Sequence, residues 1–448
     1  MSDARWQFWI DRGGTFTDVV AVRDGAPPET LKLLSENPEQ YADAAAEGIR
    51  RFLDRTPGRH QVEAVKMGTT VATNALLERR GTPTALVVTT GFADALAIGY
   101  QNRPDIFALQ IVKPEPLYAT VIEADERLAA DGSILQPLDE AAAEKSLREA
   151  YDAGQRAVAI CLVHGYRYPE HEARIGEIAK AIGFDQVSTS HDVERLIKFV
   201  SRGETTLADA YLTPVIVRYI EALKNELDRI AAPERLLFMQ SNGGLVLAEN
   251  FRGKNSILSG PAAGVVGMVE TASRQGYERL IGFDMGGTST DVSAFSGEYE
   301  RSNESEVAGV RLRAPMMRIH TIAAGGGSVL HYRDGRLQVG PDSAGANPGP
   351  ACYRRGGPLA VTDANVLLGR IPVAHFPHVF GPDGDQPLDA KIVRREFDAL
   401  AKRVGAGAES VADGFLTVAI ESMANAIRKI TIERGEDVRD FVICCLVG

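Results

Sequence analysis

The chain carries the same ten-residue pattern twice. Residues 10–19 read Ile-Asp-Arg-Gly-Gly-Thr-Phe-Thr-Asp-Val, and residues 283–292 read Phe-Asp-Met-Gly-Gly-Thr-Ser-Thr-Asp-Val. In each copy the apolar lead-in predicts a buried strand, the glycine pair permits a tight turn, and the threonines supply hydroxyls. Such a loop can bind phosphate through backbone N–H groups, while Asp11 and Asp284 at the strand ends hold Mg2+ through water. Two such loops predict a nucleotide bound between two related domains.

A single Gly-Gly-Thr turn could also belong to a β-hairpin in which the glycines serve only the turn. The recurrence of the whole pattern in register favours phosphate binding. The pattern is neither a Walker A loop nor a Gly-x-Gly-x-x-Gly dinucleotide fingerprint. The paired arrangement resembles the superfamily of sugar kinases, actin and chaperone ATPases, which implies an α/β protein with two ribonuclease-H-like domains and mixed, largely parallel sheets around a nucleotide cleft. The residues predicted to contact the nucleotide phosphates are Gly13, Gly14, Thr15, Thr17, Gly286, Gly287 and Thr288.

Several polar residues of the two copies have a second interpretation. Thr17 and Asp18 in the first copy, and Thr290 and Asp291 in the second, could instead stabilise the two hairpins. Their positions after the turn are compatible with either role.

The composition is that of a soluble globular protein with two or three domains, because 44% of the 448 residues are hydrophobic and 24% are charged. A net charge of −11 argues against nucleic acid or an anionic membrane as partner, since both need a basic surface. No apolar run approaches the ~20 residues that cross a bilayer, and the N-terminal residues lack a signal core. Four cysteines without Cys-x-x-Cys spacing predict reduced thiols and a cytoplasmic location, and scattered histidines argue against zinc.

Predicted strands and helices alternate along the chain. Strands are predicted at 84–89 and 157–162, and a helix at 138–153, which together favour parallel sheets. We place the main domain boundary near residues 200–210, where a long helix begins at Arg202. The predicted domains are therefore residues 1–205 and 206–448, with one phosphate loop in each.

Two further polar clusters follow predicted strands. Residues 67–76 begin a helix, so their hydroxyls and the helix N–H groups could bind an anionic ligand, although an ordinary N-cap is the alternative. The turn at 240–244 lies where open α/β sheets bind ligands, which makes Asn242 a candidate. A type I′ turn at this Asn-Gly pair is the alternative.

Two glycine-rich segments are also informative. Three consecutive glycines at 325–327 follow an apolar strand, and they cost conformational entropy unless a ligand or another backbone comes close. We favour ligand contact at Gly325 and Gly326. Residues 259–264 predict a tight turn into a helix of small residues, which suits close domain packing or a hinge.

Beyond the two loops, several segments share the pattern of one family: residues 6–18, 33–35, 41–44, 67–79, 241–244, 259–262, 283–292 and 340–353. On these residues the chain resembles the hydantoinase/oxoprolinase family (hydantoinase A type) over essentially its whole length. Arg12 and the opening Trp-Gln-Phe-Trp at 6–9 are most similar to the N-terminal part of the members that hydrolyse 5-oxoproline.

The resemblance implies ATP-dependent hydrolysis of 5-oxo-L-proline to L-glutamate, in which the γ-phosphoryl group activates the lactam carbonyl oxygen. In phosphoryl transfer the protein mainly positions groups and neutralises charge. The catalytic residues would be Asp11 and Asp284, which act through Mg2+ and its water shell. The residues predicted to contact the substrate are Thr69, Thr70, Asn74 and Asn242. ATP-dependent hydantoin hydrolysis and ketone carboxylation stay alternatives, as do an inactive fragment and a nucleotide-switched scaffold.

The C-terminal end departs from the family pattern. After an amphipathic helix at 411–433 and a strand at 440–445, the family continues with a Phe-Gly-Gly-Ala-Gly turn that contacts adenosine, whereas this chain reads Leu-Val-Gly at 446–448 and stops. We expect a C-terminally truncated domain whose uncovered strand lowers solubility. The resemblance also implies a second subunit or second half of hydantoinase B type, and an oligomer.

Overall fold

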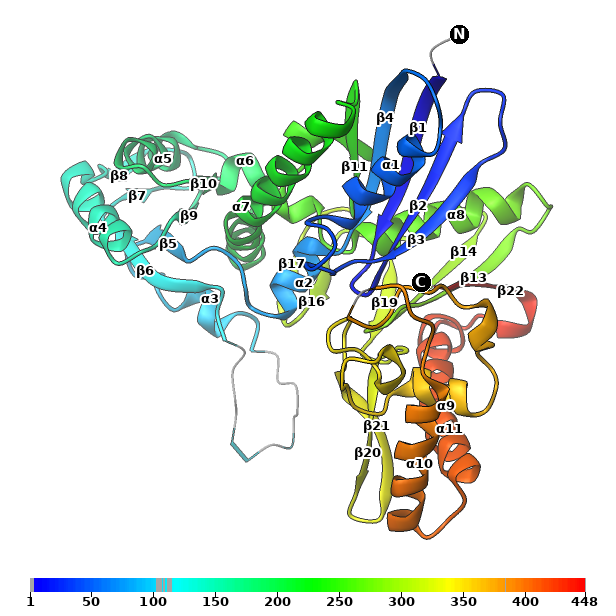
Figure 1. Ribbon diagram of the computed structural model, residues 1–448. Helices are drawn as coiled ribbons and strands as arrows, with labels where there is room; N and C mark the ends of the chain where they lie inside the picture. The colour runs from blue at the N-terminus through cyan, green and yellow to red at the C-terminus, as the bar shows by residue number, and fades with distance from the viewer. Residues whose placement is uncertain (1–3, 102–106, 108, 111–114, 383, 448) are drawn as a thin grey trace.

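The computed structural model describes residues 4–101, 107, 109–110, 115–382 and 384–447. Gly448, which belongs to the predicted truncated end, lies outside these residues. The described chain forms three lobes, two of which meet at a pair of mixed sheets while the third projects to one side (Figure 1).

The first lobe is built on a six-stranded sheet in the order β12-β11-β4-β1-β2-β3. β1 and β2 form the antiparallel hairpin that contains the first copy of the repeated pattern, and β4 runs parallel to β1 on the other side. Alternate residues of β1, such as Phe8, are buried against Phe52 of α1, as the period of a strand requires. The elements are β1 (Ala4–Arg12), β2 (Phe16–Arg23), β3 (Glu29–Leu34), α1 (Ala44–Asp54), β4 (His60–Thr69), α2 (Val71–Leu77), β11 (Arg235–Met239) and β12 (Leu245–Leu247).

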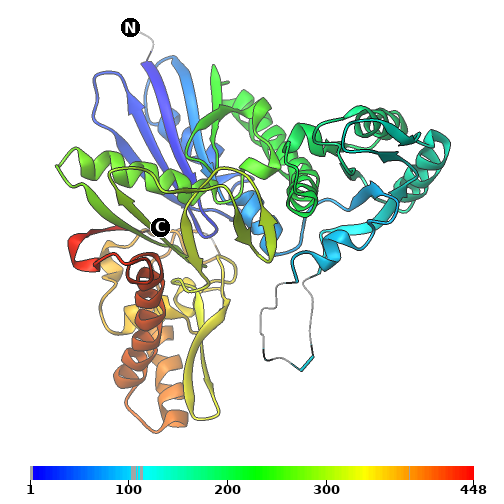
Figure 2. The same cartoon turned by 180° about the vertical axis from the view of Figure 1, so that it is seen from behind.

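A second sheet repeats this arrangement with the order β19-β14-β13-β22. β13 and β14 form the antiparallel hairpin with the second copy of the pattern, and β22 runs parallel to β13. Helix α8 packs between the two sheets and contacts β4 and β13 (Figure 2). The elements are α8 (Ser259–Ser273), β13 (Arg279–Met285), β14 (Thr290–Ser296), β19 (Ile319–Ile322) and β22 (Val442–Val447).

The third lobe is inserted between β4 and β11. Its four-stranded sheet, in the order β10-β9-β5-β6, is parallel throughout, and every residue of β5 and β9 is buried, which is the continuous apolar pattern of a parallel strand covered on both faces. The long helix α7 leads from this lobe back to the first sheet. The elements are β5 (Thr84–Thr89), α3 (Ala95–Ile98), β6 (Tyr118–Ala124), β7 (Arg127–Leu128), β8 (Ile134–Gln136), α4 (Glu140–Asp152), β9 (Ala157–Cys161), α5 (Glu170–Ile182), β10 (Gln186–Thr189), α6 (Ser190–Val193) and α7 (Phe199–Ile230).

A hairpin and three helices extend the second sheet. Asp389 caps α10 by accepting hydrogen bonds from the N–H groups of Lys391 and Ile392, and Gly405 ends the same helix in a left-handed conformation. The elements are β20 (Ser328–Arg333), β21 (Arg336–Ser343), α9 (Val361–Leu367), α10 (Ala390–Val404) and α11 (Ala408–Ile430), and two short hairpins precede them, β15 (Arg301–Ser302) with β18 (Met316–Met317) and β16 (Ser305–Val307) with β17 (Val310–Leu312).

The predicted α/β class is confirmed, and the sheets are partly rather than largely parallel, because each repeated unit contains an antiparallel hairpin. The predicted strands at 84–89 and 157–162 and the helix at 138–153 correspond to β5, β9 and α4. The boundary predicted between residues 205 and 206 falls inside α7, and β11 beyond it pairs with β4 before it. No helix in the described ranges is long and apolar enough to cross a bilayer.

Candidate functional site

The two copies of the pattern form the same turn. In the first, the Gly13 N–H donates to the Phe16 carbonyl at 3.0 Å, and in the second the Gly286 N–H donates to the Ser289 carbonyl at 3.0 Å. Asp11 lies opposite Asp18 across its hairpin, as the corresponding aspartates do across the other. The sequence repeat is therefore also a structural repeat.

The two loops face each other at close range. A Cβ added to Gly287 would overlap Thr15 Oγ1, and one added to Gly14 would lie 3.6 Å from Thr288 Oγ1. Thr15 Oγ1 is buried and has no hydrogen-bond partner in the described structure. This hydroxyl and the bare glycine backbone leave a polar cradle between the loops, as the phosphate-loop prediction requires.

Four backbone N–H groups add donors to this cradle. Those of Gly14, Thr15, Gly287 and Thr288 donate no hydrogen bond to any described residue. Thr15 is buried, Gly14 and Gly287 are half-buried and Thr288 is exposed, so most of these donors are open to solvent and available to the oxygen acceptors of a ligand.

The glycines at 325–327 lie against the second loop. The Gly326 N–H donates to the Gly286 carbonyl at 2.9 Å, and the Gly327 N–H donates to the Gly287 carbonyl at 2.6 Å. A Cβ on Gly325 would lie 2.7 Å from the Gly286 carbonyl oxygen. Close approach of another backbone therefore explains these glycines, and the predicted ligand contact at Gly325 and Gly326 stays a prediction.

Thr17 has the structural role that the sequence left open. Its side chain is fully buried, and its hydroxyl lies 2.9 Å from Ser35 Oγ. In the second copy the Thr290 hydroxyl donates to the Ala324 carbonyl at 2.5 Å. Both hydroxyls tie a hairpin to its neighbouring segment, so Thr17 corrects the expectation of a phosphate contact.

The aspartates of both copies create an excess of negative charge. Burial, followed by repulsion from Asp11, Asp291 and Asp18, raises the pKa of Asp284 to about 7. Burial and the Asp18 charge raise the pKa of Asp11 to about 6, and the Lys32 charge opposes them. The nearby cation is Lys32, whose Nζ lies 2.7 Å from Asp18 Oδ2.

A divalent cation would relieve this repulsion. Burial is also the main cause that raises the pKa of Asp291 to about 6, and the Thr321 hydroxyl donates to its carboxylate. Within the described ranges, no group of three or more His, Cys, Asp or Glu side chains could hold a metal directly. The donors fit Mg2+, which keeps several of its waters and needs few carboxylates.

Small residues allow the aspartates to come close to α8 and β4. A Cβ on Gly68 or on Gly260 would lie 3.3 Å from Asp11 Oδ1, and one on Gly264 would lie 3.6 Å from Asp284 Oδ2. The close packing predicted for residues 259–264 is confirmed. The contribution of Gly68 was missed, although it lies in the polar segment at 67–76.

The residues predicted for the substrate side lie beside the first loop, but they differ in accessibility. The Thr70 hydroxyl donates to the Arg12 carbonyl at 3.3 Å, and Asn74 Nδ2 lies 3.5 Å from Thr70 Oγ1. Thr69 is fully buried, and its hydroxyl accepts from the Val71 N–H at 3.2 Å at the start of α2. The N-cap of α2 is Thr70, whose hydroxyl makes no capping hydrogen bond, so Thr70 and Asn74 stay candidates for ligand contact.

Asn242 lies in a turn, and its predicted contact with the substrate stays a prediction. Its Oδ1 accepts from the Gly244 N–H at 2.8 Å, and the Gly243 N–H donates to the Gln240 carbonyl at 2.9 Å. Gly243 has φ +85°, while Asn242 is not among the residues with positive φ. The type I′ turn is thus wrong, because that turn needs positive φ at Asn242.

Two family models match this chain. Residues 7–183 match the hydantoinase/oxoprolinase N-terminal region, and residues 202–448 match hydantoinase/oxoprolinase. The chain belongs to the hydantoinase/oxoprolinase family. The second match alone covers more than half of the chain, so the resemblance predicted from the motifs is confirmed.

Relatives within the hydantoinase/oxoprolinase family align with nearly the whole chain. It is 43% identical to 5-oxoprolinase 1 of Arabidopsis thaliana over 100% of this chain and 39% of the relative. It is also 43% identical to 5-oxoprolinase of Saccharomyces cerevisiae over 96% of this chain and 37% of the relative. The chain therefore spans about two fifths of the length of these curated relatives.

Solved structures of related proteins share the fold. The ATP-dependent caprolactamase from Pseudomonas jessenii superposes with a TM-score of 0.77 at 33% identity, over 99% of this chain and 65% of that one. Acetone carboxylase in its nucleotide-free form superposes with a TM-score of 0.84 at 23% identity, over 98% of this chain and 65% of that one.

Proposed function

We propose that this chain is the nucleotide-binding part of an ATP-dependent cyclic amide hydrolase that converts 5-oxo-L-proline to L-glutamate. The observation that carries the proposal is the pair of facing loops with the same turn, unpaired donors and crowded carboxylates. The substrate follows from relatives named 5-oxoprolinase that are 41–43% identical over at least 95% of the chain.

The proposed nucleotide site uses both loops. The backbone of Gly13, Gly14, Gly286 and Gly287 and the hydroxyls of Thr15 and Thr288 would bind the phosphates, and Asp11 and Asp284 would hold Mg2+ through water. Bound Mg-ATP supplies the phosphoryl group that activates the lactam carbonyl oxygen. The unpaired Thr15 hydroxyl and the four free N–H groups support this assignment.

The chain's own contribution is positioning and charge control. Backbone donors fixed in two rigid hairpins need little reorganisation when charge develops on phosphate oxygens, which is the main source of catalysis in phosphoryl transfer. Thr70 and Asn74, at the first loop, are the candidates to orient the lactam.

We infer that catalysis needs a further polypeptide of hydantoinase B type, as a second subunit or a second half, within an oligomer. The limited coverage of the relatives and the 35% identity to caprolactamase subunit alpha of Pseudomonas jessenii support a divided enzyme. The cysteines in the described part of the chain are free thiols, which supports a reducing cytoplasm.

ADP release in the presence of Mg2+ and ATP tests the proposed function. The chain is mixed with its hydantoinase B type partner, and the rate of ADP release is compared between 5-oxo-L-proline, ε-caprolactam, hydantoin, acetone with bicarbonate, and no substrate. Selective stimulation by 5-oxo-L-proline supports the proposal. Stimulation by caprolactam alone would favour the second candidate, which the relationship to caprolactamase suggests, and no stimulation by any compound would reject both.

A further inference from the structure

A polar cavity lies where the inserted lobe meets the first lobe, and it shares no residue with the two loops. It encloses about 410 Å³ between α6, α7 and the short 3-10 turns η1 (Ala248–Asn250) and η2 (Gly253–Asn255). Its lining contains two carboxylates, two cations, two carboxamides and one apolar side chain: Asp192, Val193, Asp209, Asn250, Arg252, Lys254 and Asn255.

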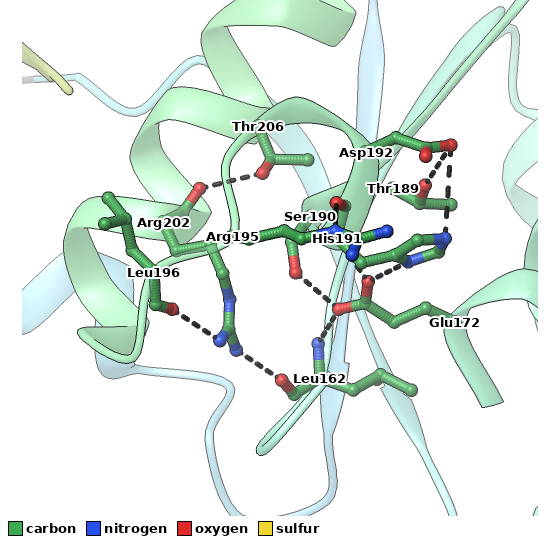
Figure 3. Close-up of polar contacts among 10 residues, drawn as sticks. All are labelled: Leu162, Glu172, Thr189, Ser190, His191, Asp192, Arg195, Leu196, Arg202 and Thr206. Atoms are coloured by element: carbon green, nitrogen blue, oxygen red, sulfur yellow. Dashed lines mark hydrogen bonds and ion pairs between the residues drawn. The ribbon is translucent and has the colours of Figure 1, made fainter. Parts of the chain in front are cut away.

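The wall formed by α6 is fixed by a buried carboxylate. Glu172 of α5 has no exposed surface and accepts hydrogen bonds from Ser190 Oγ at 2.5 Å and from the His191 N–H at 3.1 Å, while His191 Nδ1 lies 2.7 Å away (Figure 3). Asp192 follows directly, and its Oδ2 accepts from Thr189 Oγ1 at 3.2 Å. The Asp192 side chain is 68% exposed, so its carboxylate lies open to solvent at the cavity.

The base of the cavity is cross-linked by groups that already have partners. Asp209 is 1% exposed and accepts from Ser188 Oγ at 2.8 Å and from the Lys254 N–H at 3.2 Å. Lys254 Nζ donates to the Val193 carbonyl and lies 3.9 Å from Glu194 Oε2. These contacts join α6, α7 and η2 and therefore set the shape of the cavity. The charged side chains of Asp209 and Lys254 remain part of its lining.

Other lining groups have no partner. The guanidinium of Arg252, the carboxamides of Asn250 and Asn255, and Oδ1 of Asp192 make no hydrogen bond or ion pair with any described residue. A guanidinium fork binds carboxylates in a bidentate manner, and a carboxylate binds ammonium. The cavity thus offers complementary sites for both charges of one small molecule.

We propose that this cavity binds a free α-amino acid, with its carboxylate on Arg252 and its ammonium group on Asp192. A simple anion would face the charges of Asp192 and Asp209, and a simple cation would face those of Arg252 and Lys254. A zwitterion satisfies both signs. The proposal uses neither nucleotide nor lactam chemistry, so it stands or falls independently of the proposed function.

Isothermal titration calorimetry of the 448-residue chain tests the proposal with L-glutamate, L-alanine and L-lysine as probes. At least one should bind saturably with one site per chain, and ATP should leave that binding unchanged. Glutarate, which lacks the ammonium group, and inorganic phosphate should bind at least about tenfold more weakly than the best amino acid. Arg252→Met and Asp192→Asn should each weaken the amino acid at least about tenfold.

The matched control is Arg218→Met, which removes an equally exposed arginine of α7 outside the cavity. Both arginines are at the surface, so circular dichroism should show intact folds. Absence of saturable binding for all three amino acids at about millimolar concentration would overturn the proposal. If glutarate bound as tightly as the best amino acid, the ligand would not need an ammonium group and the zwitterion proposal would be rejected. If Arg252→Met and Arg218→Met bound the amino acid with equal affinity, the binding site would not be this cavity.

Discussion

Replacing Asp284 with Asn should stabilise the chain without nucleotide while abolishing Mg-ATP binding. A carboxyl group whose pKa is raised from 3.8 to about 7 binds its proton more tightly in the folded state, so the unfolding free energy falls as the pH rises between these values. A shift of about three units corresponds to at most about 4 kcal/mol at pH 7, and less than half of that at pH 5. Because the repulsion is shared among neighbouring aspartates, we expect Asp284→Asn to raise the unfolding free energy by about 2–4 kcal/mol at pH 7.

Urea denaturation at pH 5 and pH 7, without Mg2+ or nucleotide, measures this gain. Asp228→Asn, on an exposed position of α7, is the control and should change the unfolding free energy by less than about 0.5 kcal/mol. Calorimetric titration of the same proteins with Mg-ATP completes the test. Destabilisation by Asp284→Asn at pH 7, or a gain that does not shrink at pH 5, would refute the reasoning.

Three further predictions concern other parts of the molecule. Gly287→Ala, which places a Cβ on Thr15 Oγ1, should push the loops apart and weaken Mg-ATP binding at least about tenfold in a calorimetric titration. The control Gly267→Ala, whose added Cβ has nothing within 4 Å, should leave the affinity for Mg-ATP unchanged. Ile443→Lys, at a 50% exposed position of the edge strand β22, should reduce aggregation in light scattering; an unchanged aggregation rate would exclude this edge as the cause. Glu172→Gln should lower the unfolding free energy by about 1–3 kcal/mol in urea, because the buried carboxylate accepts several hydrogen bonds, and a neutral result would show that these bonds contribute nothing net.

The repeated pattern was sufficient to predict the paired hairpins and their facing loops. Identical residues in register impose identical turns, and the same hydrogen bond closes both, from Gly13 and from Gly286. The strands at 84–89 and 157–162 were predictable because continuous apolar runs bounded by polar residues leave few alternatives.

Side-chain roles were harder to predict because they depend on neighbours distant in sequence. The Thr17 hydroxyl forms a hydrogen bond with the Ser35 hydroxyl, and only the pairing of β3 with β2 brings these two residues together. Thr69 and Thr70 are adjacent, yet the Thr69 side chain is buried, whereas the Thr70 hydroxyl donates to the Arg12 carbonyl at the first loop. The polar cavity is lined by residues of α6, α7 and η2, which are separated by up to 60 positions in the sequence. No local sequence motif therefore indicates the cavity.

Calorimetric titration of the chain with ATP, with and without Mg2+, tests the central claim most directly, because one nucleotide should require both loops. We predict one Mg-dependent site per chain, which is lost in Thr15→Val and in Thr288→Val and is at least about tenfold weaker in Gly287→Ala. Two independent sites, or full affinity after disruption of either loop, would contradict it.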